Sequence, residues 1–314
     1  MQVLTFAFIG QIFTDKRPLV NNLVSLGKAV VSIPLSLALQ IWINNYGWYG
    51  CLLLMGGVVL QALPFSLLLT HIEKKFPETV GNKLNKAKEG KLIDGKLLKN
   101  KIFIIYVISC GFHVASMVIV SIYLIRFAQS LNIDSIAAAS LRSVIACVSI
   151  FLRPIVGFIS SKEQVCGWVM DRTIILIFVL LFQTISTILL ALISVNFNTI
   201  LLCTILYSIA LGCCGNLPVT LLADLFGTQN LMSSIGFRSF TIGVFSLVAP
   251  PFAALFVDIE KGNSLDYNSY RTPFYISSIC STVSCVLLYV SRYFNNSQPI
   301  EKLYRTKQAE TTVK

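Results

Sequence analysis

Charged residues are scarce in this chain of 314 residues: only 12% are Asp, Glu, Lys or Arg, about half the share found in soluble domains. Acidic residues are fewer than basic ones, with 14 Asp and Glu against 25 Lys and Arg. There are only two histidines. Apolar residues make up 55% of the chain, and the mean hydropathy is +0.75. Such a composition excludes an ordinary soluble globule and a disordered chain. It also argues against a nucleic-acid partner, because a net charge of +11 in so apolar a chain is better explained by membrane topology.

Motifs that hold metals or carry out hydrolysis are missing as well. The sequence has no H-E-x-x-H, no G-x-S-G with a partner residue and no pair of aspartates within an apolar segment. Nine cysteines are present, but their spacings do not form a disulfide framework, and Cys213 and Cys214 are adjacent inside an apolar segment. We therefore expect neither an enzyme nor a bound metal or cofactor.

Long apolar segments are what the sequence does contain. A helix needs about 20 mostly apolar residues to cross the hydrocarbon core of a bilayer. Residues 1–12 are apolar but too short, and they lack the basic start and cleavage site of a secretory signal. The pattern predicts an all-α polytopic membrane protein with about eight full helices. A partial helix at residues 1–12, interpreted as the end of a span, precedes them. The eight predicted spans are 19–43, 49–70, 102–127, 135–159, 173–195, 200–223, 233–256 and 272–293.

The distribution of lysine and arginine predicts the orientation of these helices. Residues 71–101 hold nine lysines, and placing this loop on the cytoplasmic side puts 18 of the 25 basic residues there and three outside. Because cytoplasmic loops of membrane proteins are enriched in Lys and Arg, we expect both termini and this loop to face the cytosol. The loop is interpreted as a solvated linker between two helical bundles, as in two-halved carriers; binding of anionic lipid is the alternative.

Four basic residues fall inside predicted spans, where a charge is costly and marks a functional candidate. Arg153 precedes Pro154, and its planar guanidinium matches a carboxylate, so it is predicted to bind a small organic anion. An arginine reaching to the cytoplasmic interface is the alternative. Lys28 is a second candidate contact for the anion, and reaching to the membrane interface is again the alternative. Arg142 is interpreted as a gate or an interface anchor, and Arg238 as an anchor.

Other polar groups in the spans could orient a substrate or a helix. Ser149 and Asn216 are candidate substrate contacts, although each could instead bond a free backbone carbonyl. Asp224, at the cytoplasmic end of its span, is a candidate gate or structural residue. His113 is the one histidine at mid-membrane depth, and packing is favoured for it over proton relay.

Five segments resemble, in the right order, motifs of the monocarboxylate transporter family (solute carrier family 16, major facilitator superfamily). Residues 13–27 resemble its signature at the start of the fifth helix, roughly Y-F-x-K-R-R-x-L-A-x-G-L-A-x-A-G. Tyr46-Gly47-Trp48-Tyr49-Gly50 resembles its F-G-W-R-G turn. The other three are Arg153-Pro154-Ile155-Val156-Gly157, similar to R-P-x-x-G of the eighth helix, the connection 224–236, and Pro250-Pro251 with Tyr270, Phe274 and Tyr275.

The resemblance implies a twelve-helix fold in two halves, of which the first three helices are lacking here. It assigns 1–70 to the remnant of the N-terminal half, 71–101 to the cytoplasmic linker, 102–294 to the six-helix C-terminal half and 295–314 to a cytoplasmic tail. It also implies a plasma-membrane location.

For function, the resemblance implies transport of small monocarboxylates or related solutes, with Arg153 as the substrate-binding arginine. Proton-coupled members carry an aspartate where this chain has Ser149, which argues against proton coupling. A single-span immunoglobulin-like ancillary protein is the partner that the resemblance implies. The alternative function is a non-transporting regulator or assembly partner of a full-length carrier.

Overall fold

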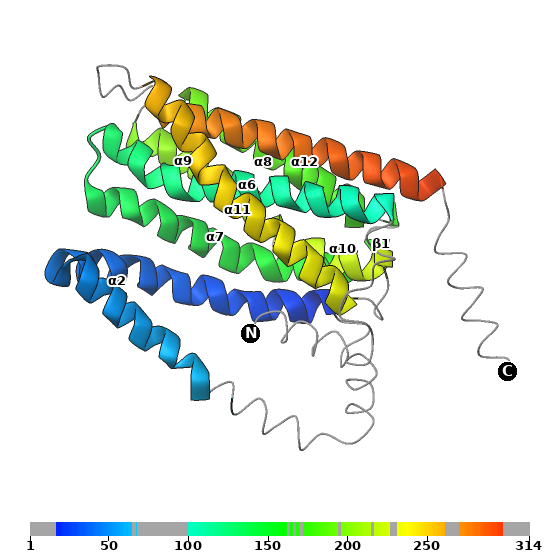
Figure 1. Ribbon diagram of the computed structural model, residues 1–314, viewed down its shortest axis with the longest axis horizontal. Helices are drawn as coiled ribbons and strands as arrows, with labels where there is room; N and C mark the ends of the chain where they lie inside the picture. Colours follow the sequence, from blue (N-terminus) through cyan, green and yellow to red (C-terminus); the bar gives the residue numbers. More distant parts are fainter. Residues whose placement is uncertain are drawn as a thin grey trace.

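The structure is a computed structural model that describes residues 17–64, 67, 100–161, 164–165, 168–169, 172–193, 196–214, 217–226, 231–260 and 270–297. Within these residues the chain forms helices and two short antiparallel strands (Figure 1). The elements are α2 (Arg17–Leu60), α6 (Lys101–Ser130), α7 (Ser135–Ser161), β1 (Gln164–Val165), β2 (Trp168–Val169), α8 (Arg172–Ile193), α9 (Phe197–Cys214), α10 (Leu217–Phe226), α11 (Leu231–Glu260) and α12 (Thr272–Ser297).

The six spans predicted after the basic loop all fall on helices. Five of them coincide with α6, α7, α8, α11 and α12 to within a few residues. The span predicted at 200–223 falls on the membrane-length segment Phe197–Leu222, which contains α9 and most of α10 on either side of residues 215–216, outside the described part. Seven helical segments of the described residues are long and apolar enough to cross a membrane. The predicted all-α polytopic membrane class is confirmed.

Of the two spans predicted before the basic loop, the first lies on one arm of α2 and the second begins on the other arm, which ends at Leu60. Gly47 separates them with φ +66° and ψ −177°, a backbone conformation that glycine adopts without steric cost. Figure 1 shows the arms folding back from this point, which agrees with the turn that the resemblance implies at 46–50. Pro34 lies inside the first arm without ending it. The predicted helix end at 1–12, most of the linker and most of the tail lie outside the described residues.

Helix α6 lies at the centre of the bundle and contacts α7, α11 and α12. Figure 1 shows α12, α6, α7 and the first arm of α2 side by side, with α11 crossing them. The buried hydroxyl of Tyr106 donates to the carbonyl of Pro218 at 2.6 Å, and that of Tyr123 to Pro250 at 3.2 Å, so α6 is tied to α10 and α11. Large apolar side chains such as Phe240 and Leu247 are exposed on α11, as expected of a surface that faces lipid.

Pairs of serines join α6 to α12. The hydroxyl of Ser109 donates to the carbonyl of Ser284, and the hydroxyl of Ser284 donates back to the carbonyl of Ser109, both at 2.8 Å. Two turns along, the hydroxyl oxygens of Ser116 and Ser277 lie 2.8 Å apart. Small side chains let membrane helices approach closely, and such hydrogen bonds hold them together where the apolar driving force is absent.

Replacing Ser284 by alanine is expected to lower the free energy of unfolding by about 1 kcal/mol, because interhelical hydrogen bonds in membranes contribute about 0.6–1.7 kcal/mol. Denaturant or thermal unfolding of the purified chain in detergent measures the change. Ser186→Ala is the matched control, since the equally buried Ser186 hydroxyl donates only within its own helix, to the Phe182 carbonyl. Equal destabilisation by both variants would show that the α6–α12 pair has no special role.

Candidate functional site

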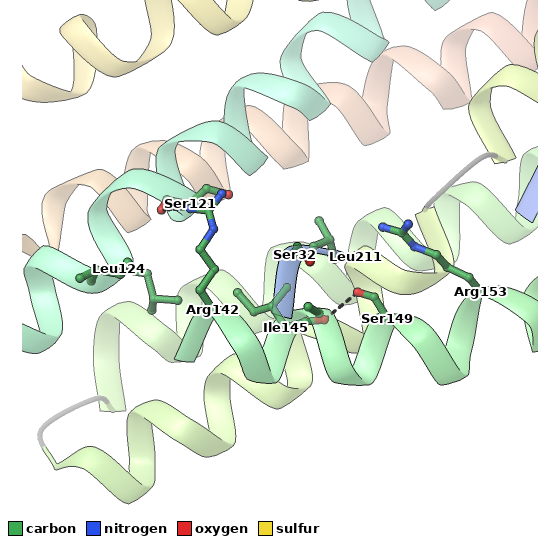
Figure 2. Close-up of a pocket in the computed structure, with 10 residues that line it drawn as sticks. Ser32, Ser121, Leu124, Arg142, Ile145, Ser149, Arg153 and Leu211 are labelled. Atoms are coloured by element: carbon green, nitrogen blue, oxygen red, sulfur yellow. Dashed lines mark hydrogen bonds between the residues drawn. The ribbon is translucent and has the colours of Figure 1, made fainter. Parts of the chain in front are cut away.

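A cavity of about 220 Å³ lies among α2, α6, α7 and α9. It is smaller than the roughly 300–1,000 Å³ typical of sites for drug-sized ligands, so it suits a small solute. Figure 2 shows its lining side chains, with α7 contributing half of them. They are Ser32 from α2, Ser121, Leu124 and Ile125 from α6, Arg142, Ile145, Ala146, Ser149 and Arg153 from α7, and Leu211 from α9.

The contribution of α7 follows from helical periodicity. Its lining residues start at Arg142 and follow it by three, four, seven and eleven positions, the spacing that places side chains on one face of an α-helix. The first arm of α2 packs against α7 and brings Ser32 to the cavity. The cavity therefore lies between the segment before the basic loop and the segment after it.

Arg153 lines the cavity near the cytoplasmic end predicted for α7. Its side chain is half-buried, and its Nε is fully shielded from solvent. Figure 2 shows the guanidinium directed along α7 toward the middle of the cavity. A guanidinium remains charged at any physiological pH and offers a planar pair of donors to a carboxylate. The geometry is consistent with the anion contact predicted from the sequence.

Ser149 lies one turn before Arg153 and is 1% exposed. Its hydroxyl donates to the carbonyl of Ile145 at 2.8 Å, so the proton is occupied and the oxygen lone pairs are left to accept a hydrogen bond. The sequence predicted either a substrate contact or a hydrogen bond to a backbone carbonyl for Ser149. The structure contains the backbone hydrogen bond. Because Ser149 also lines the cavity, a substrate contact is still compatible with the structure.

Arg142 lies at the other end of the cavity. Its Nη1 donates to the carbonyl of Ser121 on α6 at 3.2 Å, and the side chain is exposed. This bond links α7 to α6, as an anchor would, yet the same side chain lines the cavity beside Ile145 (Figure 2). Among the described lining residues, the two arginines are the charged groups and no acid accompanies them.

A close approach of α9 supports the α7 wall. A Cβ atom at the buried Gly212 would lie 3.0 Å from Cβ of Leu152 and 3.5 Å from Cα of Ser149. The two helices can approach this closely only because Gly212 has no side chain. Leu152 directly precedes Arg153, so this contact sets where both site residues lie.

The other predicted site residues are not brought into the described lining. Lys28 is one turn before Ser32 on α2, and Asp224 is on α10, but their side chains are outside the described part. Asn216 is outside it altogether. Arg238 lies on α11, which contributes no described residue to the lining, and its Nε is buried without a hydrogen-bond partner among the described residues. His113 is buried on α6, also away from that lining.

Comparison with known proteins decides the family. The Major Facilitator Superfamily profile matches residues 1–196 and 164–311, and together these cover nearly the whole chain. The chain belongs to this superfamily. Monocarboxylate transporter 4 of Gallus gallus is 28% identical over 289 residues, which cover 91% of this chain and 58% of that protein. Monocarboxylate transporter 2 of Homo sapiens is 25% identical over 271 residues, covering 80% of this chain and 55% of the relative.

These matches confirm the resemblance to the monocarboxylate transporter family and the predicted major facilitator fold. The chain is a multi-pass membrane protein of this superfamily. The chain spans somewhat more than half of the length of these two curated relatives, 58% for the Gallus gallus protein and 55% for the Homo sapiens protein.

Proposed function

We propose that this chain carries a small organic anion of the monocarboxylate type across a membrane by alternating access, with the α7 cavity as its binding site. The observation that carries the proposal is the placement of Arg153 and Arg142 in one small cavity between the two parts of the chain. Carriers of this kind bind substrate at the interface of two bundles that rock against each other. The names of the monocarboxylate transporters it resembles support the substrate class.

The proposed organisation follows the resemblance to the monocarboxylate transporter family. Residues 1–70 are the remnant of the N-terminal half, 71–101 the cytoplasmic linker, 102–294 the six-helix C-terminal half and 295–314 a cytoplasmic tail, in the plasma membrane. Arg153 binds the carboxylate, Ser149 accepts a hydrogen bond from a substrate hydroxyl, and Lys28 and Asn216 are further contacts. Arg238 and Asp224 act as structural or gating residues. A single-span immunoglobulin-like protein is the proposed ancillary partner.

Uptake into proteoliposomes tests this function. The full chain, reconstituted and loaded with unlabelled lactate, is expected to accumulate radiolabelled lactate by exchange, with saturation and with competition by pyruvate. Liposomes without protein give the background. Correctly folded protein that shows no uptake above this background would contradict transport and favour the alternative of a regulator or assembly partner.

The same vesicles test coupling. We expect an inwardly directed proton gradient to change the initial rate by less than about twofold, because the described lining offers two arginines but no group that titrates near neutral pH. A gradient of one to two pH units across vesicles of equal volume is the measurement. Several-fold stimulation would mean that a proton is loaded elsewhere and would contradict uncoupled transport.

A further inference from the structure

The exposed end of the cavity brings together a guanidinium and a hydroxyl from two helices. Arg142 on α7 and Ser121 on α6 both line the cavity there, and the Arg142 side chain is exposed. We propose that these two residues form a capture subsite, in which a carboxylate binds at the exposed end before it moves deeper into the cavity. This rests on the proposed function, since it adds a first step to binding at the same cavity.

One hydrogen bond fixes Arg142 without using up its donors. Its Nη1 donates to the backbone carbonyl of Ser121 at 3.2 Å, and the described part of the chain gives this side chain no other hydrogen bond or ion pair. A guanidinium carries five N–H groups, so further donors remain for a ligand. Because the side chain is already held against α6, it loses little freedom when an anion binds.

Ser121 contributes a second donor at the same place. Its carbonyl holds the guanidinium, and Figure 2 shows the end of the Arg142 side chain beside this residue. Ser121 is half-buried, and its hydroxyl makes no hydrogen bond with another described residue. A carboxylate has two oxygens, and it can accept one hydrogen bond from the guanidinium and one from the hydroxyl. Hydrogen bonds to a charged group are the stronger kind.

The charge of Arg142 suits the capture of an anion. A charge at the mouth of a cleft raises the local concentration of ions of opposite sign and their rate of association. The described lining holds no acidic side chain that would oppose this attraction. Because salt screens exposed charges, with a Debye length of about 10 Å at 0.1 M and about 3 Å at 1 M, capture by Arg142 should weaken as ionic strength rises.

The test measures how salt changes lactate uptake by the full chain in proteoliposomes. Initial rates are compared at about 20 mM and about 500 mM sodium chloride, where screening differs most, with osmolality balanced by sucrose. Wild type is expected to show a KM at least fivefold higher at the higher salt. Arg142→Gln should raise KM about tenfold at low salt, leave kcat within twofold and reduce the salt effect to less than twofold. Arg142→Lys should keep the salt effect.

Two further variants separate the parts of the subsite from general charge. Ser121→Ala removes the hydroxyl but keeps the carbonyl that holds Arg142, so it should raise KM threefold or more with the salt effect retained. Arg126→Gln is the matched control, because Arg126 is an exposed arginine on α6 outside the described lining. Its KM and salt effect should stay close to wild type. A salt effect in Arg142→Gln equal to that of wild type would overturn the subsite and leave Arg142 as an anchor.

Lactate binding is measured separately from transport, as the rise in the unfolding midpoint of the purified full chain. Arg142→Gln should need about tenfold more lactate for the same rise. If this difference is found without any uptake, the proposed transport fails and the capture subsite is supported. Equal lactate requirements of wild type and Arg142→Gln would overturn the subsite even if uptake is observed. If Arg142→Gln does not fold, Ser121→Ala decides, and a wild-type KM in that variant contradicts the subsite.

Discussion

Uptake of lactate is expected to fall at least about 30-fold when Arg153 is replaced by glutamine. The substitution keeps much of the size and hydrogen-bonding capacity but removes the charge and the planar fork that binds a carboxylate in two places. Losing one partner of a buried, hydrogen-bonded charge pair costs about 2–5 kcal/mol, and each 1.4 kcal/mol is about tenfold in affinity. Initial rates over a range of lactate concentrations measure the loss, most of which should be in KM.

Two variants control for general damage. Arg153→Lys keeps the positive charge without the fork and should retain a measurable part of the uptake. Arg126→Gln removes another arginine from a membrane helix, exposed on α6 and outside the described lining, and should change uptake by less than threefold. A well-folded Arg153→Gln protein with wild-type uptake would show that Arg153 does not bind substrate.

Gly212→Val is expected to have the second largest effect, a loss of uptake of tenfold or more with a lower midpoint of thermal unfolding. The Cβ atom would meet Leu152 at 3.0 Å from its Cβ and 3.3 Å from its Cδ1, and the two valine methyl groups add to this crowding. Overpacking of this kind costs about 1–3 kcal/mol. The wall bearing Ser149 and Arg153 must shift to relieve it, so binding suffers beyond stability.

Gly243→Val is the matched control, because a Cβ at Gly243, an exposed position in the middle of α11, would meet nothing within 4 Å. It should leave both uptake and unfolding close to wild type. Adding Leu152→Ala to Gly212→Val creates room at the contact and should recover part of the activity, a non-additivity expected only of touching residues. Wild-type uptake in Gly212→Val would contradict the role of this contact.

The sequence predicts most of the helices because a membrane imposes a simple rule of length and hydropathy. That rule locates α6, α7, α8, α11 and α12 and the two arms of α2, whose turn at Gly47 was signalled by its polar and aromatic neighbours. It also locates the membrane-length segment Phe197–Leu222, on which α9 and most of α10 lie. The short strands β1 and β2 are missed, since two residues carry no periodic pattern.

Sequence reasoning singles out residues of the cavity lining where the chemistry is unusual within one helix. Arg153 is singled out because a charge in a span is costly, and Ser149 because it is a polar group within a span. The shared face of Arg142 and Arg153 could have been read from their spacing of 11 residues but was not. The roles of Ser121, Leu211 and Gly212 could not be read, because they depend on which helices pack against α7, and hydropathy does not encode that choice.

Protection of a cysteine in the cavity by substrate tests the central claim most directly. Ala146 lines the cavity, and Ala146→Cys in a Cys147→Ser background can be labelled with a small uncharged thiol reagent and followed by mass spectrometry of that peptide. Saturating lactate is predicted to slow this labelling at least fivefold. The control is the native Cys147 in the wild-type protein, which is exposed and outside the described lining. Lactate is predicted to leave the labelling rate of Cys147 unchanged. Equal labelling rates of Ala146→Cys with and without lactate would contradict an anion site in the α7 cavity.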